Sequence, residues 1–193
     1  DDLTGDGKKD YAIKGVHKNN GSTQLVVKNW QTKQTHRTYK WVDNWKDTQI
    51  ITMSDITYDG IPEVALYGKH RRLDKGQLFI LNGHTADKLS VYNWNALWSD
   101  TQLFEMEDLD GDGTLDWGQY GKRKDDGRLQ WVVKKGHDKR GVIRIFSWPA
   151  GLDEAKPMLV NEMTGDGIKE VAVTGRVGSN KLVLRINDGR MPN

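Results

Sequence analysis

Four short loops in this sequence carry oxygen-bearing side chains at a spacing that suits a metal ion. The richest is DLDGDGTLD, residues 108–116, which has carboxylates at its first, third, fifth and ninth positions and Gly113 at its sixth. Alternate residues of such a loop can point oxygens at one centre, and the seventh residue, Thr114, can add its backbone carbonyl. The glycine allows the sharp turn that returns the ninth carboxylate to that centre. The spacing predicts a Ca²⁺ site.

The same pattern occurs three more times, as DLTGDGKKD (2–10), DITYDGIPE (55–63) and EMTGDGIKE (162–170). These loops have three carboxylates each and a threonine at the third position, which offers a neutral oxygen. Two replacements weaken the pattern: Tyr58 stands where the other loops have glycine, and Glu162 stands where they have aspartate. With the seventh residue acting through its carbonyl, the predicted ligands are Asp2, Thr4, Asp6, Lys8 and Asp10; Asp55, Thr57, Asp59, Ile61 and Glu63; Asp108, Asp110, Asp112, Thr114 and Asp116; and Glu162, Thr164, Asp166, Ile168 and Glu170.

The alternative is that these loops are only Asp- and Gly-rich turns that connect strands. An EF-hand is not indicated, because the twelfth position of the third loop is Gln119 rather than glutamate and no helical pattern flanks the loop. If the loops do bind Ca²⁺, affinities of about 10⁻⁴ to 10⁻³ M are expected for an extracellular module.

The loops belong to a longer repeat. Their first residues are 53, 53 and 54 positions apart, and each loop is followed by a strand-like run that ends at a glycine, always at the same distance from the start of the loop. A constant period near 50 residues indicates one supersecondary unit repeated along the chain. The four glycines are Gly15, Gly68, Gly121 and Gly175.

Each unit contains short β-branched, aromatic and alternating segments separated by Gly, Asn and Asp turns, without sustained helical periodicity. We therefore expect an all-β protein in which each unit is four antiparallel strands, A to D, with the acidic loop joining A to B. Four-stranded units of this length fit the blades of a β-propeller. The blades would cover about 1–45, 46–98, 99–152 and 153–193. The first would lack strand A and the last strand D, so we expect a piece of a larger ring and a longer parent chain with other domains.

The loop followed by a short apolar strand and glycine resembles the FG-GAP/VCBS-type repeat of integrin-like β-propellers, and the resemblance covers essentially the whole chain. It implies that the loop links the first two strands of a blade and holds Ca²⁺. It also implies a secreted or cell-surface protein that serves adhesion or glycan binding, or that acts as a scaffold beside polysaccharide-degrading domains.

Composition limits the remaining choices. Only 36% of the 193 residues are hydrophobic, and no apolar run approaches the roughly 18 residues of a membrane span. No signal-peptide pattern is present, so an exported parent would have lost it or the sequence is an internal piece. The absence of cysteine excludes a disulfide framework. A formal net charge of +2 does not indicate a nucleic-acid partner.

Aromatic and basic residues suggest a ligand face. Trp41, Trp94 and Trp148 recur at a constant distance before the next loop, a regularity that favours packing between blades. Trp45 and Trp98 lie in turn-like stretches and are candidates for stacking on a sugar. Basic residues gather in the B–C turns, which would share a face with these tryptophans, opposite the acidic loops. This face could bind an acidic polysaccharide or could be only a solvated rim. The candidate ligand-binding residues are Trp45, Trp98, Arg71, Arg72, Arg123 and Lys124.

No sequence signature of catalysis is present: the chain has no cysteine, no G-x-S-x-G and no H-E-x-x-H. The leading hypothesis is a non-catalytic, calcium-stabilised module that binds an extracellular glycan or protein. A second hypothesis is the propeller portion of a secreted polysaccharide-degrading enzyme, and a third is a purely architectural repeat array.

Overall fold

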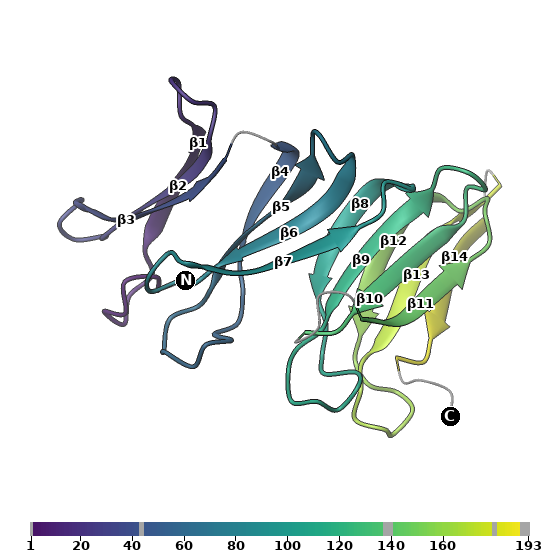
Figure 1. Cartoon of the computed structure of the whole chain (residues 1–193). Coiled ribbons are helices and arrows are strands. Elements are labelled where there is room, and N and C mark those ends of the chain that lie inside the picture. The colour runs from purple at the N-terminus through teal and green to yellow at the C-terminus, as the bar shows by residue number, and fades with distance from the viewer. Residues whose placement is uncertain (1, 43–44, 137–140, 179–180, 190–193) are drawn as a thin grey trace. The chain divides into compact units, whose positions relative to one another are not determined.

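The structure is a computed structural model that describes residues 2–42, 45–136, 141–178 and 181–189. Over these residues the chain is all-β, with fourteen strands in four antiparallel sheets and no helix (Figure 1). Contacts divide the chain into two compact units, residues 1–96 and 97–193, and each unit holds two sheets. Within the described ranges, no helix could cross a lipid bilayer.

The first unit contains a three-stranded and a four-stranded sheet, and strands that follow one another in sequence pair in both. The three-stranded sheet is β1 (Tyr11–Val16), β2 (Thr23–Lys28) and β3 (Thr35–Trp41); the four-stranded sheet is β4 (Trp45–Thr52), β5 (Val64–His70), β6 (Lys75–Leu81) and β7 (Lys88–Trp94).

The second unit has the same two kinds of sheet in the reverse order. The four-stranded sheet is β8 (Trp98–Glu105), β9 (Trp117–Arg123), β10 (Leu129–Lys134) and β11 (Val142–Trp148); the three-stranded sheet is β12 (Asp153–Val160), β13 (Glu170–Val177) and β14 (Lys181–Asn187). The antiparallel four-stranded sheets agree with the expected strand order, and among the described residues the first sheet has no strand before β1 and the last has none after β14. The radial arrangement of a propeller stays a prediction.

The first strand of each four-strand repeat begins earlier than predicted. The alternating segments TQIITMSD (48–55), TQLFEMED (101–108) and AKPMLVNE (155–162) predict starts at Thr48, Thr101 and Ala155, whereas β4, β8 and β12 begin at Trp45, Trp98 and Asp153. Each of these strands contains a β-bulge next to its start, and the bulge holds one acidic residue at positive φ: Asp47 at 53°, Asp100 at 52° and Glu154 at 53°. The polar residues that resembled a turn are therefore a bulge inside the strand.

The glycine that recurs after each acidic loop lies against this bulge. A Cβ on Gly68 would come within 3.1 Å of the Lys46 carbonyl oxygen, and one on Gly121 within 2.9 Å of the Trp98 Cβ. Gly15 holds the same repeat position in β1, where strand A is absent, and a Cβ there would meet no atom within 4 Å. The repeated glycine is thus explained by the neighbouring bulge.

Hydrophobic cores form between the two sheets of each unit. In the first unit Leu25, Tyr39 and Trp41 pack with Val64 and Leu66 of the next sheet. In the second unit Trp131, Phe146 and Trp148 of the four-stranded sheet pack with Leu152, which directly precedes β12, and with Val171 and Val173 of β13. The predicted packing role of the recurrent tryptophans is confirmed for Trp41 and Trp148, and Trp94 is also buried.

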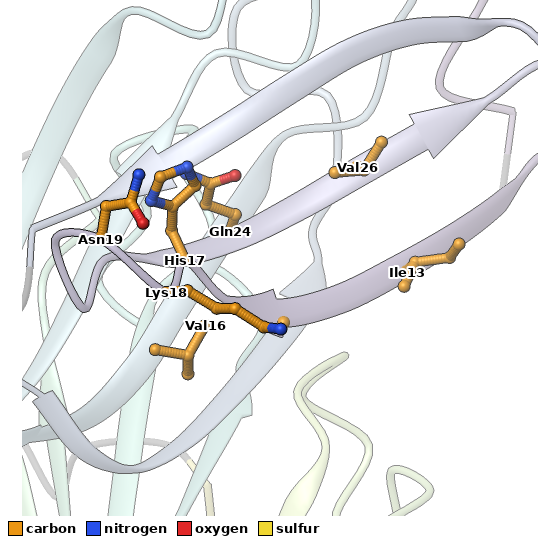
Figure 2. Close-up of a pocket in the computed structure, with 8 residues that line it drawn as sticks. Ile13, Val16, His17, Lys18, Asn19, Gln24 and Val26 are labelled. Carbon is orange, nitrogen blue, oxygen red and sulfur yellow. The ribbon is translucent and has the colours of Figure 1, made fainter.

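The open edge of β1 differs from the matching strands of the other repeats. Its residues after Tyr11 are all exposed, whereas β5, β9 and β13 are largely buried. Ile13 is 53% and Val16 is 67% exposed. A hollow of about 380 Å³ lies at this strand, and Figure 2 shows His17, Asn19 and Gln24 gathered at the β1–β2 turn with Ile13 and Val26 farther along the strands. In the other sheets strand A (β4, β8 or β12) pairs with the strand that matches β1, whereas this edge of β1 is left open.

Candidate functional site

In the second, third and fourth repeats the acidic loop meets the segment that follows strand C, which is β6, β10 or β14. The side chain of the ninth loop residue lies between the loop and this segment. The three side chains are almost completely buried: Glu63, Asp116 and Glu170. One carboxylate oxygen accepts a hydrogen bond from the backbone N–H of a turn glycine: Gly83 to Glu63 at 2.7 Å, Gly136 to Asp116 at 2.9 Å and Gly189 to Glu170 at 2.9 Å. The other oxygen accepts from the loop itself, at Thr57, Leu109 and Met163. The ninth carboxylate therefore joins two chain connections.

These turn glycines are needed because the backbones approach closely. A Cβ on Gly83, Gly136 or Gly189 would lie 1.9–2.1 Å from the carbonyl oxygen of the residue before the ninth loop position. No side chain fits at that distance. Sequence reasoning missed this role, although the three glycines recur with the same period as the loops. In the first repeat the same position is Trp30.

The first loop residue organises the loop backbone. Asp2 accepts hydrogen bonds from the N–H groups of Thr4, Gly5, Asp6 and Gly7, and Asp108 accepts from Gly111, Asp112 and Gly113. Burial would raise the pKa of Asp2, but its four backbone donors outweigh burial and lower it. The fifth residue caps the loop, because its carboxylate accepts from the N–H of the seventh residue in all four loops. These bonds support the turn interpretation of the loops and leave metal binding open as an additional role.

The second loop forms the same turn despite Tyr58. Its φ of 58° is in the left-handed region, close to the values of Gly5, Gly111 and Gly165 at the same loop position. The tyrosine side chain is 83% exposed and does not block the turn. The replacement of glycine by Tyr58 therefore adds local backbone strain to the second loop without preventing the turn, since residues other than glycine rarely adopt this conformation.

The third loop brings three predicted ligands together. Asp108, Asp110 and Asp116 each offer an oxygen, and these three atoms lie within 4.8 Å of one another. Among the described residues, no other group of acidic and histidine side chains reaches this geometry. Three carboxylates so close together can hold a metal ion. The fourth predicted carboxylate, Asp112, instead accepts from the N–H of Thr114 at 2.8 Å.

The environment of Asp116 disfavours its charge. Burial raises the pKa of Asp116 to about 6, despite hydrogen bonds from Leu109 and Gly136, and the nearby Asp110 and Asp112 raise it further. A bound cation would reverse this effect, because it would stabilise the ionised form.

A lysine takes part in the third loop. Lys135 Nζ lies 2.7 Å from Asp110 Oδ2, and this hydrogen bond raises the pKa of Lys135. The matching residues of the first two repeats are Asn29 and Asn82, whose side-chain amides donate to Asp6 and Asp59 at 3.0 Å. Each contact relieves repulsion among the loop carboxylates. Sequence reasoning missed these three residues, although they too recur with the period of the loops.

The carboxylates of the first, second and fourth loops do not gather in the same way. Their third position is threonine, so each loop has one fewer charged ligand than the third. In the second loop the Thr57 hydroxyl donates to Glu63 at 2.8 Å. The third loop is therefore the strongest metal candidate among the described residues.

The predicted aromatic and basic ligand face is only partly present. Trp45 pairs with His70 and Trp98 with Arg123, so strand A begins beside the B–C turn in both four-stranded sheets, as predicted. The placement of both tryptophans in turns is wrong, because each begins a strand. Trp45 is only 6% exposed and packs in the core, so its face cannot stack on a sugar. Trp98 is half-buried and donates its indole N–H to Gln130 at 3.2 Å.

The basic side chains of that face are partly neutralised. Arg123 forms ion pairs with Asp125 and Asp126, and its guanidinium lowers the pKa of Asp125 to about 2. Arg71 donates from Nε to the Trp45 carbonyl at 3.0 Å, while Arg72 and Lys124 are exposed. The B–C turn after β9 therefore has a smaller net positive charge than its lysines and arginines alone would give.

Comparison of the sequence with protein-family models gave no match, and comparison with curated proteins also gave none. The geometry of the loops and turns therefore carries the functional conclusion.

Proposed function

We propose that this chain is a non-catalytic binding module of a secreted or cell-surface protein, stabilised by Ca²⁺ and binding an acidic polysaccharide. The observation that carries the proposal is the group of Asp108, Asp110 and Asp116, whose ligand oxygens lie within 4.8 Å of one another. A hard cation would replace repulsion among these carboxylates with attraction.

Calcium is favoured over other metals by the chemistry of the available ligands. The loop offers carboxylate, hydroxyl and backbone oxygens, and the chain has no cysteine to supply a soft ligand. Calcium accepts six to eight oxygens in a flexible arrangement, which suits a short loop that also keeps its own hydrogen bonds, whereas Mg²⁺ demands near-octahedral geometry.

The proposal includes a propeller arrangement of FG-GAP/VCBS type for the four sheets. It is supported by the regular period of the loops, by the four-stranded antiparallel unit and by the apolar cores between the two sheets of each unit. The resemblance to that family depends on the loop and strand sequences alone.

A calcium titration followed by calorimetry tests the metal part. If the dissociation constant is near 10⁻⁴ M, 10 mM Ca²⁺ should stabilise the fold by about 2.7 kcal/mol. This corresponds to a rise in Tm of about 5–10 °C for a chain of this size, which chelator should reverse. Asp108→Asn should reduce the rise, and Asp87→Asn, an exposed change outside the loops, should leave it unchanged.

Lys135→Gln provides a second measurement on the same loop. Removing the ammonium group deletes the positive charge that competes for Asp110, so the Ca²⁺ affinity should increase several-fold. A Tm that neither Ca²⁺ nor chelator changes would contradict the metal proposal.

Binding and turnover assays with acidic polysaccharides separate the three functional classes. Binding without cleavage supports the module proposed here, whereas cleavage by the parent protein supports the enzyme hypothesis. The absence of binding to any glycan or protein supports an architectural array.

A further inference from the structure

We propose that Trp30, Tyr11, Lys8 and Lys9 form a binding site for one sugar residue of an acidic saccharide. The inference rests on the proposed function, because it assigns a place to the ligand that the module would bind. It moves that place from the B–C turns to the opposite end of the first sheet, beside the first acidic loop.

Trp30 is an exposed aromatic residue at a position where the other repeats need glycine. Its indole is 57% exposed, whereas Gly83, Gly136 and Gly189 lie tightly against the loop of their own repeat. The indole contacts Tyr11 and Lys33 at the surface and is not part of the hydrophobic core of its unit. One exposed aromatic side chain is common on a protein surface, so the case for a site depends on what surrounds Trp30.

The indole is held in place before any ligand binds. Its ring meets the Tyr11 ring edge to face, with centroids 6.2 Å apart and planes at 88°. Lys33 Nζ lies 3.8 Å from the Trp30 ring centroid, a cation–π distance. The turn itself is fixed by Asn29, whose side-chain oxygen accepts from the N–H groups of Gln31 and Thr32 at 3.0 Å. Binding to this surface would therefore require little ordering.

A hollow of about 510 Å³ adjoins the two rings, and Lys8, Lys9, Asp10, Tyr11 and Trp30 line it. Both lysines are exposed. The aromatic rings offer an apolar surface, the ammonium groups attract negative charge, and Asp10 can accept a hydrogen bond from a hydroxyl group. A pyranose that carries a carboxylate or sulfate presents all three complementary features.

The rings favour a saccharide over a nucleic acid base. Because their planes are nearly perpendicular, they form a corner and cannot hold a flat base between two parallel faces. A single-stranded nucleic acid also needs a positive groove along its backbone. The described lining of this hollow has two lysines, Lys8 and Lys9, which can pair with a single carboxylate or sulfate but do not form a groove along a polynucleotide backbone.

The test measures binding of trigalacturonate by calorimetry and by Trp fluorescence, with neutral cellotriose and oligo(dT) as comparison ligands. Trp30→Ala should reduce trigalacturonate affinity about tenfold or more, because the main apolar contact is lost. Trp30→Phe should retain part of the binding, and Lys9→Gln should weaken it several-fold and reduce its dependence on salt. The control is Tyr58→Ala, which removes another highly exposed aromatic ring from a different acidic loop and should change nothing.

Three outcomes would overturn the inference. If trigalacturonate binds equally to the protein and to Trp30→Ala, the ligand site lies elsewhere and the proposed function stands. If trigalacturonate does not bind at all, the ligand part of the proposed function fails as well, while the calcium titration still decides its metal part. If oligo(dT) binds more tightly than trigalacturonate and Trp30→Ala abolishes that binding, the site is one for single-stranded nucleic acid.

Discussion

Asp116 combines two roles that conflict in the metal-free protein. Its carboxylate connects the third loop to Gly136 through a hydrogen bond, and it is also one of three carboxylates whose ligand oxygens lie within 4.8 Å of one another. The structural role requires burial, and burial next to Asp110 and Asp112 raises the pKa of Asp116 to about 6. A cation would remove the conflict, because it would compensate the charge where water cannot reach it.

This conflict predicts a pH dependence of metal binding. The folded-state pKa of Asp116 lies above its ordinary value of 3.8, so this group's contribution to stability is complete below about pH 4 and is lost as the pH rises through about 6. Ca²⁺ must displace the proton, so the affinity of the third loop should fall about tenfold for each pH unit below 6. Calorimetric titrations with Ca²⁺ at pH 5, 6 and 7.5 measure this change in affinity.

The control for this experiment is Asp108→Asn, which removes a first-position ligand of the third loop. Any binding that remains in this variant belongs to other loops. The pKa of Asp2, in the first loop, is lowered by backbone donors, so binding there should vary little between pH 5 and 7.5. An affinity of the third loop that stays constant over this range would contradict the role assigned to Asp116.

At the scale of the strand, the bulge determines which residues face the next sheet. The stretch around Asp47 has a polar, turn-like composition, but the bulge absorbs Asp47 at positive φ and lets pairing continue to Trp45. Trp45 therefore begins the strand and is not part of a loop, and its side chain packs in the core of the first unit. The same event recurs at Asp100 and Glu154.

Much of the architecture could be predicted because the regular period of the loops and the alternation of apolar and polar residues within strands can be read directly from the sequence. The bulge could not, because a positive φ at an aspartate depends on the neighbouring strand. The same reason explains why Lys135 and Asn82 were missed as loop partners. They come from turns that lie two strands beyond their loops along the chain, and only the pairing of the strands brings them to the loops.

A matched pair of glycine substitutions tests the bulge. Gly121→Ala places a Cβ 2.9 Å from the Trp98 Cβ and 3.1 Å from the Ser99 carbonyl oxygen, so it should destabilise the fold by roughly 1–3 kcal/mol. Gly15→Ala changes the same repeat position where nothing lies within 4 Å, and it should be neutral or slightly stabilising. Urea unfolding of both variants measures the difference. Equal effects would mean that the bulge does not explain the repeated glycine.

At the scale of the whole molecule, the two three-stranded sheets leave apolar strands uncovered. β14 exposes Leu182, Leu184 and Ile186, and β1 exposes Ile13 and Val16. Exposed apolar edges favour pairing with a further strand. The other sheets show how an added strand would pair with β1, because β4, β8 and β12 each pair antiparallel with the strand that follows the acidic loop.

This geometry allows a first strand to be supplied by design. In the second repeat, β4 and one further residue, Met53, are separated from the acidic loop by Ser54 alone. Fusing the sequence of residues 45–53, WKDTQIITM, directly before Asp1 would reproduce the same spacing to the first loop. The added strand should pair with β1, with its tryptophan opposite His17 and its glutamine opposite Lys14, by analogy with Trp45 and Gln49 in the second sheet.

Pairing of the added strand should be visible in stability and in hydrogen exchange. Covering Ile13 and Val16 should stabilise the first unit by roughly 2 kcal/mol, which raises its Tm by several degrees. The backbone N–H groups of β1 that face the open edge should exchange more slowly, while those of β13, which already has two neighbours, should not change. The matched control is the same fusion with proline in place of its glutamine and its second isoleucine, because proline cannot donate to a strand ladder. If both fusions gave the same Tm and the same exchange rates in β1, the open edge would not be a site for strand addition.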